Sequence, residues 1–133
     1  MANICRLHWD ATKGVEVESL QGLDNTIDRL QKEAAQSRPI LVEVIRSTGD
    51  VLIIGLGLEN AVLNYTPATK NPPYYVSVRE GAETTEDTVV YYFFGAHTEF
   101  PSRFLIPMQQ ARLALRHFVE TGHLAKEINW EQV

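Results

Sequence analysis

The fold is decided by residues 89–130, which read VVYYFFGAHTEFPSRFLIPMQQARLALRHFVETGHLAKEINW. The first six residues are β-branched or aromatic, the types that favour a strand. A turn is expected at 95–102 and an amphipathic helix at about 107–121. Pro107 suits the first turn of that helix, because the N–H that it lacks would have no partner there. Gly122 suits the left-handed position that ends a helix.

A second amphipathic helix is expected at about residues 24–36. Asp24 is a favourable N-cap residue, and apolar residues follow it at spacings of three and four. Pro39 ends the helix, because the residue before a proline is pushed out of the helical region. The apolar stripe consists of Ile27, Leu30 and Ala34.

Outside the two helices the apolar period changes to two residues, which is typical of strands. The connections are short, so consecutive strands pair antiparallel. We therefore predict one α+β domain over residues 1–133, an antiparallel sheet of about five to six strands with both helices packed on one face. The expected strands are 3–8, 40–46, 51–57, 61–65, 74–78 and 88–94, with a short piece at 15–17.

The composition is that of an ordinary globular protein, with 44% hydrophobic and 22% charged residues. A net charge of −5 argues against nucleic acid or an anionic membrane as a partner, because phosphates need a basic surface. The one cysteine, Cys5, has no partner for an internal disulfide. No signal peptide and no membrane-spanning apolar run is visible, so we expect a cytoplasmic protein.

Signals for catalysis and metal binding are weak. The Gly55-Leu56-Gly57 stretch is not followed by a helical pattern, which argues against a dinucleotide-binding loop. The four histidines lack the spacing of a metal site, and we expect no metal and no cofactor. His97, Glu99 and Ser102 are residue types used in acyl transfer, although Ser102 is not on a nucleophile elbow. A small enzyme or ligand-binding domain that uses this turn is the alternative function.

The connection between the expected strands 74–78 and 88–94 is acidic. Such loops are commonly only solvated, but a negative loop can also dock as a prong in the basic cleft of a partner protein. The acids are Glu80, Glu83, Glu86 and Asp87.

A series of short motifs runs through the chain from the Gly55-Leu56-Gly57 stretch onward. Leu63-x-Tyr65 comes next, and the turn reads Gly95-x-x-Thr98-Glu99-x-Pro101. The helix reads Ile106-Pro107-x-x-x-Ala111-x-x-Ala114-x-x-x-Phe118-x-x-x-Gly122, and Trp130 follows it. In these motifs and their order, over roughly residues 40–132, the chain resembles immunity protein family one of bacterial polymorphic toxin systems. The first forty residues resemble the family only in having a strand and a helix.

The resemblance implies a cytosolic inhibitor and not an enzyme. Such proteins bind a cognate toxin domain, often one of the nucleic-acid deaminase fold, and block its active site. A nucleic-acid enzyme has a basic cleft, so acids and buried aromatic anchors are the expected contacts on the inhibitor. The candidate toxin-binding residues are Glu80, Glu83, Glu86, Asp87 and Glu59, together with Tyr74 and Tyr75.

Overall fold

The computed structural model describes residues 4–10, 12–81 and 87–133. Within these residues, helices and an extensive, mostly antiparallel sheet confirm the expected α+β class. The helices are α1 (Leu20–Gln36) and α2 (Met108–Thr121), with a short 3-10 helix, η1 (Ser102–Phe104). The strands are β1 (Cys5–Asp10), β2 (Lys13–Val17), β3 (Ile40–Arg46), β4 (Val51–Leu56), β5 (Asn60–Ala61), β6 (Leu63–Thr66), β7 (Tyr75–Val78), β8 (Thr88–Phe93), β9 (Ala96–Pro101), β10 (Ile106–Pro107) and β11 (Asn129–Gln132).

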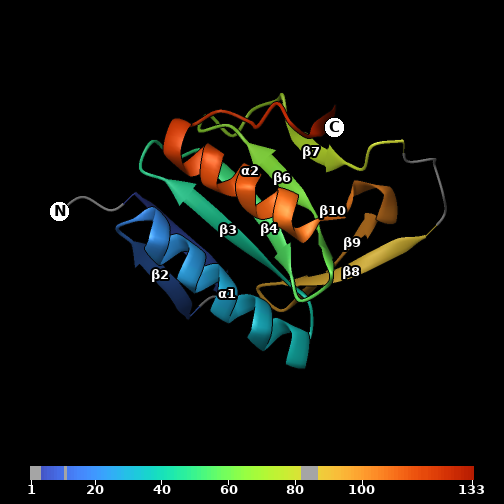
Figure 1. Cartoon of the computed structure of the whole chain (residues 1–133), viewed down its shortest axis with the longest axis horizontal. Helices are drawn as coiled ribbons and strands as arrows, with labels where there is room; N and C mark the ends of the chain where they lie inside the picture. The colour runs from blue at the N-terminus through green and yellow to red at the C-terminus, as the bar shows by residue number, and fades with distance from the viewer. Residues whose placement is uncertain (1–3, 11, 82–86) are drawn as a thin grey trace.

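The main sheet is larger than expected, with nine strands within the described residues. Its path runs β11-β7-β6-β4-β3-β1-β2, and Figure 1 shows both helices crossing one face of it. The β8–β9 hairpin branches from this path where Tyr92 pairs in parallel with Ile40 at the start of β3. The expected turn at 95–102 was too long. The turn consists of Phe94 and Gly95, and β9 then pairs along the whole of β8.

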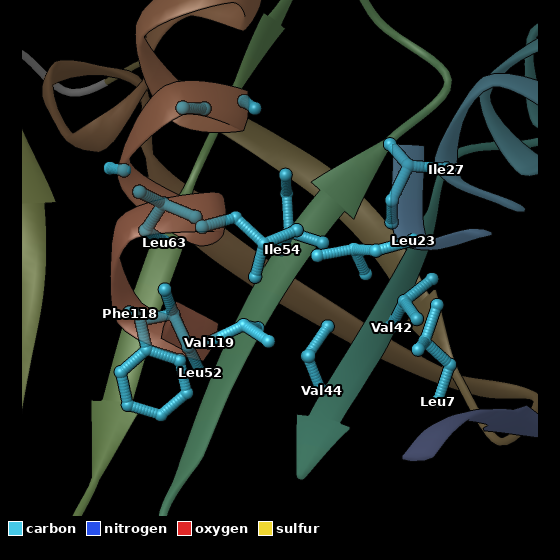
Figure 2. Close-up of a cluster of buried hydrophobic side chains, with 14 of the residues drawn as sticks. Leu7, Leu23, Ile27, Val42, Val44, Leu52, Ile54, Leu63, Phe118 and Val119 are labelled. Atoms are coloured by element: carbon cyan, nitrogen blue, oxygen red, sulfur yellow. The ribbon is translucent and has the colours of Figure 1, made fainter. Parts of the chain in front are cut away.

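The main core lies between the helices and the sheet. The apolar stripes of both helices are buried against β3 and β4 (Figure 2), and each fully buried aliphatic side chain contributes about 1.5–3 kcal/mol of hydrophobic free energy. The helices supply Leu23, Ile27, Leu30, Ala34, Ala111, Ala114, Leu115, Phe118 and Val119. The facing strand residues include Leu7, Val42, Val44, Leu52, Ile54 and Leu63.

Helix α1 begins four residues before the expected start, because Ser19 and not Asp24 caps it. The Ser19 hydroxyl accepts a hydrogen bond from the Gly22 N–H at 3.0 Å. Asp24 instead joins the two helices, since Arg116 of α2 donates to its carboxylate at 3.0 Å. Arg112 donates in the same way to Asp28, and this hydrogen bond lowers the pKa of Asp28.

A second apolar cluster covers part of the opposite face of the sheet. It is built around Leu41 of β3 and Tyr91 of β8, and the β8–β9 hairpin and η1 close it. The Tyr91 ring is fully buried over Gly55, where an added Cβ would lie 2.5 Å from the ring. Burial raises the pKa of Tyr91 well above its ordinary value, against a smaller opposing effect of the Val62 backbone. The hairpin is therefore fixed to the sheet by a close aromatic contact with a glycine.

The C-terminal residues return to the sheet as β11, which pairs with β7. The Trp130 indole N–H donates to the Ala125 carbonyl at 2.9 Å. Arg103 of η1 donates to both carboxylate oxygens of Glu131, at 2.7 and 2.8 Å. These contacts hold β11 against η1 and the segment that follows α2.

Candidate functional site

The described ends of the expected acidic loop meet at η1. The Arg79 N–H donates to the Arg103 carbonyl at 2.8 Å, and the Ser102 N–H donates to the Asp87 carbonyl at 3.0 Å. Because Ser102 and Arg103 are neighbours, the exposed side chains of Glu80 and Asp87 lie at the same end of the molecule. The other two expected acids, Glu83 and Glu86, lie outside the described residues.

Glu59 lies apart from these acids, in the turn between β4 and β5, and its side chain is exposed. The turn is fixed to α1 by Gln31, whose amide donates to the Leu58 carbonyl at 2.9 Å and accepts from the Gly57 N–H at 2.7 Å. Gly57 is needed there, since its φ is +109° and an added Cβ would meet Ala34 at 3.0 Å. Glu59 therefore projects from a rigid turn beside the C-terminal half of α1.

Tyr74 and Tyr75 are half-buried at the opposite end of β7 from Glu80. The Tyr74 hydroxyl donates to the Lys70 carbonyl at 2.8 Å. The Tyr75 ring packs on that of Tyr65, with 6.3 Å between ring centroids. At about 3.3 Å per strand residue, the fold separates these tyrosines from Glu80 by roughly 15 Å. Their role as partner anchors stays a prediction.

The three residues of the catalytic alternative follow one another along β9 and its end. His97 pairs with Tyr92 and Glu99 with Val90, so both side chains are on one face of the hairpin, and both are exposed. Ser102 lies beyond the strand, at the start of η1. None of the three lines any of the grooves described below. In the part of the chain that the structure describes, these side chains are therefore not gathered in a groove, the setting in which catalytic groups usually converge.

Two further observations concern nucleophilic and metal-binding side chains. Burial raises the pKa of the Cys5 thiol to about 11, so it stays protonated and unreactive at neutral pH. Among the described residues, no group of three or more histidine, cysteine, aspartate or glutamate side chains could hold a metal ion.

The tip of the β8–β9 hairpin exposes an aromatic side chain. Phe94 and Gly95 form a two-residue turn in which both φ angles are positive, at 51° and 80°. Such turns prefer Asn-Gly, because a bulky side chain is strained at positive φ. Phe94 occupies this position although it is 41% exposed. Its ring packs edge-on against that of Phe93.

A cleft of about 350 Å³ lies beside this tip, between the end of β1, the C-terminal half of α1 and β8. We call it the hairpin cleft. The Arg38 guanidinium lies over the Tyr92 ring, 4.2 Å from its centroid. The residues that matter for its chemistry are Trp9, Asp10, Glu33, Arg38 and Tyr92. Sequence reasoning missed this cleft, although it singled out the aromatic strand that supplies one wall.

A second groove, of about 380 Å³, runs between α2 and the segment that leads to β11. Its lining is mainly apolar and includes Ala114 and Ile128. Leu113 at its edge is 62% exposed. These two grooves of the described residues differ in character, since the hairpin cleft is aromatic and charged and the groove beside α2 is mainly apolar.

Comparison with known proteins gives the family of the chain. The family model described as immunity protein Imm1 matches residues 11–132. The chain belongs to the Imm1 family. The match reaches β2 and α1, so the family likeness is more extensive than the expected 40–132. No curated protein matches the chain.

Membership of the Imm1 family indicates a role in neutralising a toxin, and thus a toxin protein as partner. No helix in the described part of the chain is long and apolar enough to cross a membrane. In the hairpin cleft, Arg38 and Tyr92 lie within the Imm1 match, whereas Trp9 and Asp10 immediately precede it.

Proposed function

We propose that this Imm1 protein is a cytoplasmic, stoichiometric inhibitor that binds a cognate toxin domain and blocks its active site. The family match over residues 11–132 carries the proposal. The positions of His97, Glu99 and Ser102 support a binder over an enzyme, since they surround no described groove. We further propose that the toxin acts on nucleic acid, with a deaminase as the favoured class.

The charge of the protein supports a basic partner. A nucleic-acid enzyme attracts phosphates with a positive cleft, and an inhibitor with a net charge of −5 is attracted by the same field. Exposed Glu80 and Asp87 lie together beside η1, and Glu59 projects from its rigid turn. These acids, with Glu83 and Glu86, would speed association, while Tyr74 and Tyr75 would add contact area.

The proposal is tested with a candidate cognate toxin domain, in a catalytically inactive form. The Glu80→Lys/Asp87→Lys variant should slow association roughly tenfold at low salt, with a smaller effect at high salt. The matched control is Glu16→Lys/Glu18→Lys, which makes the same charge change at two exposed acids next to α1. Equal association rates for both variants at every salt concentration would contradict the proposed role of Glu80 and Asp87, which we call the acidic end. A wild-type chain that does not bind would sink the proposed function.

A further inference from the structure

Phe94 has a backbone conformation that is energetically unfavourable for its residue type. Its positive φ suits asparagine or glycine, and its ring is 41% exposed. The ring contact with Phe93 is the one aromatic contact that it makes within the described residues. Strain that is kept at an exposed position points to a use outside the free protein.

The hairpin cleft borders Gly95, the residue that follows Phe94 in the turn, and it has polar groups that the protein itself leaves unbonded. Within the described chain, the Trp9 indole N–H, the Tyr92 hydroxyl and the Arg38 guanidinium donate no hydrogen bond. All three side chains line the cleft, and Gly95 of the same turn lies at its edge. Tryptophan, tyrosine and arginine are the residue types that most often carry the binding energy of an interface.

The charges around the hairpin cleft identify the partner's chemistry. Among its described lining residues, Asp10 and Glu33 supply two negative charges and Arg38 one positive charge. Glu99 lies on the same face of the hairpin as the Tyr92 ring. None of these acids makes an ion pair within the described residues. A basic side chain is therefore the complementary ligand. The Trp9 wall suits it because a cation is attracted to a ring face, whereas Arg38 of the protein itself already lies over the Tyr92 ring.

We propose that the hairpin cleft and Phe94 together are the anchor site for the toxin. Phe94 inserts into an apolar hollow of the toxin domain, and an arginine or lysine of the toxin enters the cleft against Trp9, close to Glu33. This inference rests on the proposed function and deepens it. The acidic end near Glu80 acts on association, whereas a buried anchor acts on dissociation.

The test compares stability and dissociation in the same variants. Phe94→Asn places a residue that tolerates positive φ in the turn, so its thermal midpoint should equal or exceed that of the wild type. Its dissociation from the immobilised, inactive toxin domain should be at least tenfold faster. Glu33→Lys, on the exposed face of α1, should also speed dissociation. Leu113→Asn is the matched control, since it removes an exposed apolar side chain from the other groove.

The outcomes separate the anchor site, an anchor elsewhere on the surface, and failure of the proposed function itself. Faster dissociation of Phe94→Asn and Glu33→Lys, with unchanged dissociation of Leu113→Asn, supports the anchor site. Dissociation at the wild-type rate for both Phe94→Asn and Glu33→Lys overturns it. Faster dissociation of Leu113→Asn alone also overturns it and places the anchor in the groove between α2 and the segment that leads to β11. If the wild-type chain does not bind the toxin domain, the proposed function fails first and the anchor site fails with it.

Discussion

Replacing Gly55 with alanine should destabilise the protein by crowding the Tyr91 ring. The added Cβ would lie 2.5 Å from Cζ and 2.6 Å from Cε1 of a ring that is fully buried. Carbon atoms pack at about 3.5–4.0 Å, so the overlap is roughly 1 Å. Overpacking of this kind costs about 1–3 kcal/mol. For a domain of this size, a loss of about 2 kcal/mol should lower the thermal midpoint by roughly 6–10 °C.

A double-mutant cycle identifies the cause of that loss. Tyr91→Leu removes the ring atoms that the new Cβ would meet, so Gly55→Ala should cost little in the Tyr91→Leu background. The coupling energy from urea denaturation, followed by circular dichroism, should be about 1–3 kcal/mol. Costs that add to within about 0.5 kcal/mol would refute the contact as the reason for the glycine. The result matters for function, because this contact fixes the hairpin that carries Phe94 and Tyr92.

Two further substitutions test other parts of the fold. Gly122→Ala should destabilise the protein by about 1 kcal/mol in thermal unfolding, because φ is +80° there and the new Cβ would also displace the Arg46 guanidinium. An unchanged midpoint would contradict the left-handed helix end. Burial opposes the charge of Asp50, but hydrogen bonds from Thr48 and Arg46 outweigh it and lower the pKa of Asp50. This stabilisation is present above the ordinary pKa of 3.8 and is lost as pH falls through the lower folded value. Asp50→Asn should therefore be less stable at pH 7 and should lose less stability on acidification below pH 3.8 than the wild type does, as measured by urea unfolding.

Both helices were predictable from sequence because their apolar stripes repeat over several turns. The expected helix at 107–121 matches α2, and the other was wrong only at its start. Ser19 and Asp24 are both good capping types, and local preference did not choose between them. A tertiary contact favours Ser19 as the cap, because a helix that begins at Leu20 leaves the Asp24 side chain free to pair with Arg116.

In contrast to the helices, neither the β9 strand nor the hairpin cleft could be predicted from local sequence patterns. The exposed polar residues of β9 resemble a turn, and Phe94-Gly95 is not a usual hairpin sequence. The cleft draws Trp9 from β1, Arg38 from the connection between α1 and β3, and Tyr92 from β8. These residues come together only because β8 meets β3 in parallel at Ile40, a long-range pairing that no local pattern encodes.

Titration of the active toxin domain with this chain tests the central claim most directly. A stoichiometric inhibitor should reduce toxin activity in proportion to the amount added and abolish it at one equivalent, with a 1:1 complex in native mass spectrometry. Loss of toxin activity at a small fraction of an equivalent, increasing with time, would show that the chain acts as an enzyme. Full toxin activity at several equivalents would contradict inhibition altogether.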